Sequence, residues 1–81
     1  MKIKLQFFAQ LRDLAKTSET VLEVPVGTTI RDLAEIIAGQ HPELASHLKT
    51  VSYAMDNEYT PANTEIKSDS TIALIPPISG G

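Results

Sequence analysis

The residues whose types and order could support chemistry stand at the end of the chain, in the hexapeptide Pro76-Pro77-Ile78-Ser79-Gly80-Gly81. Proline holds its own backbone φ at about −65°, so Pro76 and Pro77 favour a stiff, extended arm. Gly80 and Gly81 carry no Cβ, which lets the backbone and its terminal carboxylate enter a channel too narrow for a side chain. Six extended residues reach about 20 Å. This order of residues predicts a carboxylate presented at the end of an arm; a frayed terminus and a cloning remnant are the alternatives.

The rest of the chain offers little other chemistry. Cysteine is absent, which excludes a thiol nucleophile, a disulfide framework and a zinc–thiolate site. His41 and His47 are six residues apart and do not match the i, i+4 spacing of a helical metal pair, so we expect exposed histidines and no metal site. Gly27 and Gly39 are isolated and form no phosphate-binding loop. We therefore expect a protein that is acted upon rather than one that acts.

Composition narrows the class of partner. The 81 residues suit one domain, and seven basic and ten acidic residues give a formal net charge of −3. The basic residues are scattered along the chain, which argues against a nucleic-acid partner. No apolar run approaches the roughly 20 residues of a membrane span. The start Met1-Lys2-Ile3-Lys4 lacks the features of a signal peptide, so we expect a cytoplasmic protein without a membrane partner.

Strands are indicated by alternation and by β-branched residues. Ile3, Leu5 and Phe7 point to one side of residues 2–8, which predicts a half-buried strand. Phe8 breaks the alternation, as either a core residue at the strand end or an exposed aromatic anchor for a partner. Further strands are expected at 20–24, 51–55 and 71–75, with short pieces at 59–60 and 64–66 and a turn at 56–58.

A short helix is expected over residues 9–16, because Leu11, Leu14 and Ala15 share one helical face. A helical turn is expected over 42–48.

The main helix is expected to begin with Thr29 as its N-cap and Asp32 in a capping-box position. Ile30, Leu33, Ala34 and Ile37 form its apolar stripe. Gly39 fits a left-handed residue at its end, followed by Pro42.

The order of these elements predicts an α+β domain. One main helix would pack on one face of a mixed sheet, with a short helix after the first strand, as in the β-grasp or ubiquitin-like fold. The near-continuous apolar run 71–75 predicts a central strand beside the first, buried on both faces. We expect a β-grasp domain over 1–75 and an extended tail over 76–81 that ends in Gly-Gly.

Three segments resemble one protein family. Phe-Phe-Ala-Gln-Leu-Arg-Asp-Leu at 7–14 and Ile-Pro-Pro-Ile-Ser-Gly-Gly at 75–81 are similar to the two signatures of the small subunit of molybdopterin synthase, the MoaD family of ubiquitin-like sulfur carriers. Val-Gly-Thr-Thr-Ile-Arg-Asp-Leu at 26–33 resembles the family's entry to its main helix. The similarity covers the whole chain. It departs at Leu74-Ile75, where many members place an aromatic residue before the prolines.

The resemblance implies a sulfur carrier without a permanently bound cofactor. A ubiquitin-activating-like enzyme would use ATP to adenylate the carboxylate of Gly81, and a sulfur donor would displace AMP to leave a thiocarboxylate. The arm would enter the large subunit of molybdopterin synthase, within a heterotetramer of two small and two large subunits. There the sulfur would pass to cyclic pyranopterin monophosphate, to build the dithiolene of the molybdenum cofactor. The catalytic side chains would lie in the large subunit.

The resemblance also implies roles for single residues. Gly81 is the reacting group, and Gly80 gives clearance in the partner's channel. Ser79, Ile78, Pro77 and Pro76 form the rest of the inserted arm. Phe8, Leu74 and Ile75 are candidates for an apolar docking patch at the root of the tail, with a place in the core as the alternative for each.

Three other functions share this fold or this ending. A sulfur carrier for thiamine thiazole would use a different activating partner and acceptor. A ubiquitin-like modifier would join Gly81 to a lysine of another protein. A plain interaction domain would carry an inert tail.

Overall fold

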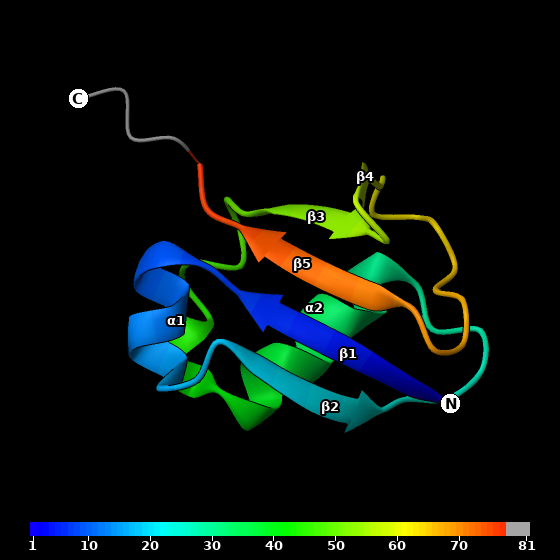
Figure 1. Cartoon of the computed structure of the whole chain (residues 1–81), viewed down its shortest axis with the longest axis horizontal. Coiled ribbons are helices and arrows are strands. Elements are labelled where there is room, and N and C mark those ends of the chain that lie inside the picture. The colour runs from blue at the N-terminus through cyan, green and yellow to red at the C-terminus, as the bar shows by residue number, and fades with distance from the viewer. Residues whose placement is uncertain (78–81) are drawn as a thin grey trace.

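The computed structural model describes residues 1–77 and shows a five-stranded sheet with one long helix across one face (Figure 1). Residues 78–81 lie outside the described part. The elements are β1 (Lys2–Phe7), α1 (Ala9–Ala15), β2 (Glu19–Glu23), α2 (Ile30–Gln40), the 3-10 helix η1 (Pro42–Leu44), β3 (Ser52–Met55), β4 (Glu58–Tyr59) and β5 (Thr71–Ile75).

The strand order is β2-β1-β5-β3-β4, with β5 in the centre as predicted. β1 and β5 run parallel, with Lys4 opposite Thr71 and Phe7 opposite Leu74, and the other neighbours are antiparallel. The mixed sheet and its helix confirm the α+β, β-grasp prediction. Because β5 is central, the chain that leaves its end starts from one of the best-anchored strands of the fold.

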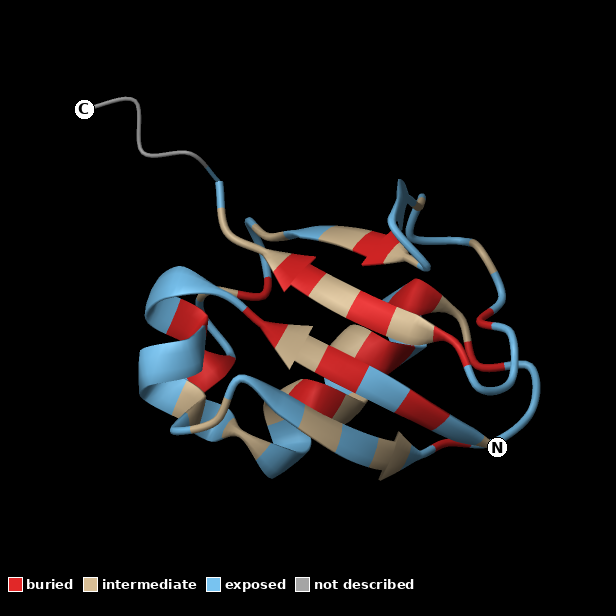
Figure 2. Cartoon of the chain, in the orientation of Figure 1, coloured by how far each residue is buried: buried red, intermediate tan, exposed pale blue. Residues whose placement is uncertain are grey.

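The core lies between α2 and one face of the sheet (Figure 2). Alternation selects its members, because side chains two residues apart in a strand share a face. The largest fully buried side chains come from β1, α1, α2, η1 and β5: Ile3, Leu5, Phe7, Leu11, Ile30, Leu33, Ile37, Leu44, Ile72 and Leu74.

The start of α2 has the predicted capping box. The Asp32 N–H donates to Thr29 Oγ1 at 3.2 Å, and the Thr29 N–H donates to Asp32 Oδ2 at 3.2 Å. Each bond satisfies a donor that the first helical turn leaves free, and such a cap stabilises a helix by about 1 kcal/mol.

The end of α2 differs from the prediction. Gly39 lies inside the helix, which runs to Gln40, so its predicted left-handed role is wrong. His41 is the C-cap, with φ −129° and ψ 73°, and its N–H donates to Ile37 O at 2.7 Å. Pro42 explains this ending, because proline disfavours the helical conformation of the residue before it.

Two predictions of burial also need correction. Leu14 is 37% exposed, because the seven-residue α1 packs inward through Leu11 and ends at Lys16, whose φ is +62°. The central strand β5 is fully buried on one face only. Ile72 and Leu74 face the core, whereas Thr71, Ala73 and Ile75 on the other face are half-buried. Alternate residues of the apolar run 71–75 therefore belong to the core and to the surface of the sheet.

The β3–β4 hairpin turns through Asp56 and Asn57, both with positive φ (50° and 74°), as expected for a tight two-residue turn. The piece predicted at 64–66 is present as an isolated bridge between Thr29 and Glu65.

Among the described residues, no helix has both the length and the apolar composition needed to cross a membrane.

Candidate functional site

The described chain ends at the root of the predicted arm. β5 stops at Ile75, Pro76 is half-buried and Pro77 is exposed, so the chain moves from core to surface within three residues. Figure 1 shows the C-terminal end of β5, and with it the end of the described chain, at the same end of the sheet as α1. The predicted site residues Ile78, Ser79, Gly80 and Gly81 lie outside the described residues.

Phe8 stands beside this root. Its backbone is extended (φ −122°, ψ 155°), so it continues the alternation of β1 onto the face that α2 does not cover. The β1–β5 register ends with the pair Phe7 and Leu74, and its continuation by one residue puts Phe8 level with Ile75. Phe8 is 44% exposed, which decides between the two interpretations in favour of a surface aromatic.

The sharp turn after Phe8 depends on Ala9. Ala9 has φ +51°, a left-handed conformation that costs a residue with a Cβ about 1–2 kcal/mol. The turn lets α1 start at once and send Leu11 into the core, while Phe8 stays on the sheet surface. Strained backbone next to an exposed aromatic is typical of a surface under functional constraint.

Leu74 does not belong to the docking patch. Its side chain is fully buried against the core, on the α2 face of β5, so the prediction for this residue is wrong. Ile75, one position later, points to the opposite face and stays half-buried at the root of the tail. Within a run of consecutive apolar residues, hydrophobicity alone does not show which side chains face the core. The register of the sheet shows it.

The apolar surface extends across β3 to β4. Ala73 of β5 pairs with Ala54 of β3, and Ala54 pairs with Tyr59 of β4, which is 73% exposed. We call the four residues Phe8, Ala73, Ile75 and Tyr59 the tail-root face. Sequence analysis missed Tyr59, although counting outward from the Asp56-Asn57 turn would have placed it opposite Ala54.

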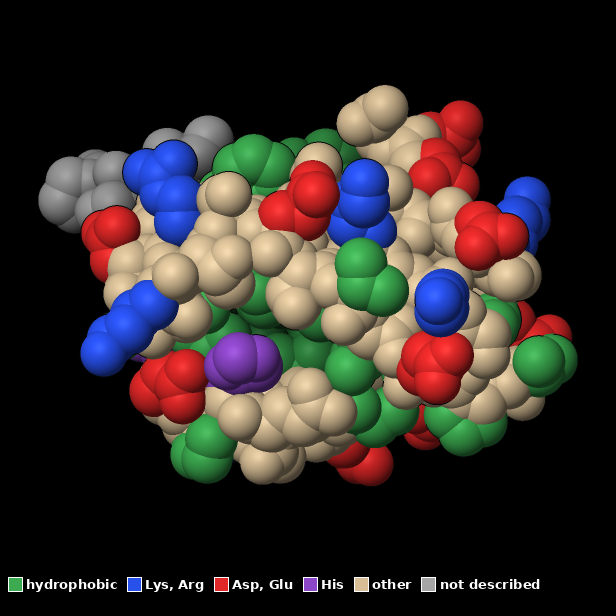
Figure 3. Space-filling model, turned by 60° about the horizontal axis from the view of Figure 1, so that its bottom comes forward, with side chains coloured by type: hydrophobic (Ala, Val, Ile, Leu, Met, Phe, Trp, Pro, Cys, Tyr) green, Lys and Arg blue, Asp and Glu red, His purple; other side chains and the backbone are tan. Residues whose placement is uncertain are grey.

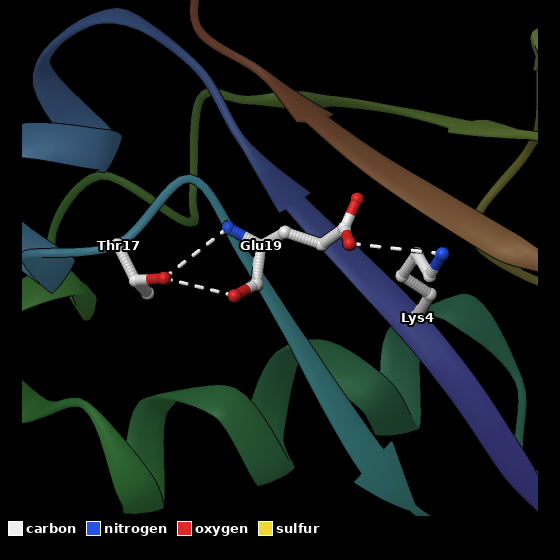
Figure 4. A network of polar contacts seen from close by, with 3 residues as sticks. All are labelled: Lys4, Thr17 and Glu19. Carbon is white, nitrogen blue, oxygen red and sulfur yellow. Dashed lines mark hydrogen bonds and ion pairs between the residues drawn. The ribbon is translucent and has the colours of Figure 1, made fainter.

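The other half of the same sheet surface is charged. Lys4 Nζ lies 3.6 Å from Glu19 Oε1 across β1 and β2, and Glu19 also exchanges backbone hydrogen bonds with Thr17 Oγ1 at 2.8 and 3.3 Å (Figure 4). Both charged side chains are about half exposed, so their ion pair adds little stability. Val21 of β2 is an isolated exposed apolar residue on this half, whereas the apolar residues next to the tail form a group on the β5, β3 and β4 side.

Histidines and carboxylates form no reactive cluster among residues 1–77. No group of three or more His, Cys, Asp or Glu side chains is arranged there to hold a metal. His41 Nδ1 lies 3.2 Å from Glu43 Oε2, and its ring stands edge-on to Phe7 with centroids 6.0 Å apart. A hydrogen bond from its own backbone, helped by His41, lowers the pKa of Glu43. Both His41 and His47 are half-buried rather than fully exposed as predicted.

Charges of both signs are interspersed over the face seen in Figure 3, where hydrophobic side chains also gather in a central hollow. This distribution lacks the single-sign field that steers a polyanion. The described residues thus form a rigid platform that holds the root of a tail beside an apolar surface.

Comparison with known proteins agrees with this arrangement. A match to the ThiS family covers residues 5–81, from the middle of β1 to the final glycine.

The chain belongs to the ThiS family.

Curated relatives of this ThiS-family chain match it end to end. It is 39% identical to a molybdopterin synthase sulfur carrier subunit of Chlamydomonas reinhardtii, with all of both chains covered. It is 31% identical to the protein of the same name from Arabidopsis thaliana, with all of this chain and 84% of the relative covered.

Solved structures support the fold of this ThiS-family chain. Crystalline SAMP1 of Haloferax volcanii superposes with a TM-score of 0.89 at 22% identity, with all of both chains covered. A chain of the complex of subunits 1 and 2 of the molybdopterin-converting factor of Helicobacter pylori superposes with a TM-score of 0.72 at 22% identity, again with all of both chains covered. These likenesses place the chain among ubiquitin-like β-grasp proteins.

Proposed function

We propose that this chain is the sulfur carrier subunit of a molybdopterin synthase. The observation that carries the proposal is the position of the tail: its root leaves the central strand β5 beside the apolar tail-root face. A partner that covers this face receives the tail at the same time. The full-length similarity to curated sulfur carrier subunits, which includes the terminal Gly-Gly, supports the same function.

The first step activates the carboxylate of Gly81. A carboxylate oxygen attacks the α-phosphorus of ATP in an adenylating enzyme, pyrophosphate leaves, and a mixed anhydride with AMP forms. Sulfide from the sulfur donor then attacks the acyl carbon, displaces AMP and releases a proton. The product is a C-terminal thiocarboxylate, whose sulfur can act as a nucleophile without any cysteine in this chain.

The second step transfers the sulfur. The tail enters the large subunit, where the thiocarboxylate sulfur attacks an oxygen-bearing carbon of cyclic pyranopterin monophosphate. The C–O bond at that carbon breaks, and the oxygen leaves and takes up a proton. Water hydrolyses the resulting thioester at its acyl carbon, so the carrier regains a carboxylate and the sulfur stays on the pterin. The Helicobacter pylori complex of subunits 1 and 2 supports a partnership of this kind.

The tail residues suit this role for physical reasons. Pro76 and Pro77 restrict the free arm and so reduce the conformational entropy lost on docking. Gly80 and Gly81 keep the last two positions free of side chains.

Reconstituted synthase tests the proposal. The thiocarboxylated chain should convert cyclic pyranopterin monophosphate with the large subunit, whereas Gly80→Ala should reduce conversion without lowering the unfolding temperature. Gly39→Ala is the matched control, because it makes the same change at an exposed helical site. Conversion by Gly80→Ala equal to that of Gly39→Ala would remove the proposed clearance role, and absence of conversion by the unaltered chain would overturn the function.

A further inference from the structure

A second surface feature lies at the β3–β4 edge of the sheet. A groove of about 740 Å³ separates the first turns of α2 from the β3–β4 hairpin. Its apolar lining includes Ile30 and Ala34 from α2 and Leu48 and Val51 from the segment before β3. The groove is open to solvent rather than enclosed, so it suits a segment of a chain better than a small enclosed ligand.

The wall of the groove is preformed. The Arg31 N–H donates to Ala62 O at 2.9 Å, and the Ile30 N–H donates to Thr64 O at 3.1 Å. These bonds satisfy two free donors of the first helical turn and attach the segment after β4 to α2. A preformed site loses less conformational entropy when it binds a partner.

The charge of the groove is opposite to that of the chain. Its only charged lining residues are Arg31 and Lys49, and no carboxylate lines it, although ten acidic residues give the chain a net charge of −3. Neither cation forms an ion pair with another residue of the described range 1–77. Two cations over an apolar floor favour an anionic group flanked by apolar ones.

Tyr53 adds a second feature to the groove, a buried hydroxyl group. It lines the groove, and its hydroxyl oxygen is covered and has no hydrogen-bond partner among residues 1–77. Burial raises the pKa of Tyr53 to about 12, so the hydroxyl stays protonated and can donate. A buried hydroxyl without a hydrogen-bond partner destabilises the fold, because it has lost its bonds to water. An occupant that brings an acceptor and shifts a neighbouring side chain would recover part of this cost.

We propose that this groove binds an extended acidic segment of a protein partner. An Asp or Glu side chain of the segment would lie between Arg31 and Lys49, and its apolar neighbours would pack on Leu48 and Val51. Two isolated cations on an acidic protein do not suit a nucleic acid, which needs a stripe of basic residues.

The groove begins close to the root of the tail. Ser52, which lines it, pairs with Ile75 at the end of β5. A partner bound at the tail-root face can therefore place a second segment in the groove. Tyr59 lies at the boundary and belongs to both surfaces. The inference does not depend on sulfur transfer, because the groove would bind its own ligand.

Nuclear magnetic resonance titration of the whole chain tests the inference. The probe is a blocked peptide in which Asp and Leu alternate, and the comparison peptide alternates Lys and Leu. We expect saturable shifts of the amides of Arg31, Lys49, Tyr53 and Ala62 with the acidic peptide, and affinity at least about tenfold weaker for the basic one.

Variants locate the binding site. Arg31→Glu combined with Lys49→Glu should weaken binding about tenfold or more, whereas Lys67→Glu, an exposed cation outside the groove, should leave it unchanged. Arg31→Gln and Lys49→Gln alone should each give a smaller loss, which keeps the test valid if the double variant unfolds. Tyr53→Phe should weaken binding without removing it.

Several results would overturn the proposal. These are equal affinity for the two peptides, shifts confined to Phe8, Ala73 and Ile75 of the tail-root face, or full affinity in the double variant. Amide shifts in the groove that appear on raising the protein concentration without peptide would assign the groove to a second copy of the chain instead.

Discussion

Phe8 and Ile75 occupy neighbouring positions on the sheet face that α2 leaves uncovered, one residue beyond the buried pair Phe7 and Leu74. A single register thus divides two consecutive apolar pairs between core and surface. The surface pair stands where the chain passes into Pro76, so it lies next to the root of the tail.

Phe8→Asp should weaken binding to the large synthase subunit by about tenfold to a hundredfold, because central aromatic residues dominate interface energies. Calorimetric titration measures this. Val21→Asp is the matched control, since Val21 is also an exposed apolar residue on the same face, but over β2. Its affinity should stay within about twofold of the unaltered chain. Equal losses in the two variants would refute a docking surface confined to the tail root.

Leu74→Ala and Ile75→Ala should have different effects despite their adjacency. Leu74→Ala leaves a cavity in the core and should lower the free energy of unfolding by about 2–5 kcal/mol. Ile75→Ala removes a half-buried side chain and should cost about 1 kcal/mol, with its larger effect on partner binding. Urea denaturation measures the first difference and titration with the large subunit the second. Similar stability losses would contradict the assigned faces.

Gly39→Ala should raise the free energy of unfolding by about 0.5–1 kcal/mol, because Gly39 is helical and an added Cβ meets no atom within 4 Å. Gly27→Ala should lower it by about 1–2 kcal/mol, since Gly27 has φ +94°. Thermal and urea unfolding of the two variants give opposite signs if the described end of α2 is correct. Destabilisation by Gly39→Ala would restore the C-cap role.

Tyr53→Phe should change the alkaline stability of the chain. Burial raises the pKa of Tyr53 from 10.0 to about 12, so the folded state holds a proton that the unfolded state releases first. Stability is therefore fully present below pH 10 and falls as the pH rises toward 12. Tyr53→Phe should reduce this loss, whereas Tyr59→Phe, at an exposed site, should not. Parallel urea titrations at several alkaline pH values compare them.

Local sequence patterns were sufficient to predict much of the fold. The Thr29–Asp32 box, the Asp56-Asn57 turn and the central place of β5 were predicted correctly, because each follows from neighbouring residues or from strong apolar character. The prediction for Gly39 was wrong because a glycine can also lie within a helix. Here Pro42 determines where α2 ends.

The candidate site depended more on pairing across the sheet. Leu74 and Ile75 are both apolar, so only the register with β1 and β3 distinguishes core from surface. Tyr59 joins the tail-root face through its pairing with Ala54. Arg31 and Lys49 meet in one groove although they lie far apart in sequence, which no local pattern could indicate.

Intact mass spectrometry of the chain tests the central claim most directly. The chain is incubated with an adenylating enzyme, ATP and a sulfur source, and then with the large subunit and cyclic pyranopterin monophosphate. The account predicts a mass gain equal to the replacement of one oxygen by sulfur, located at Gly81, which is lost in step with product formation. An unchanged mass, or attachment of Gly81 to a lysine of another protein, would contradict it.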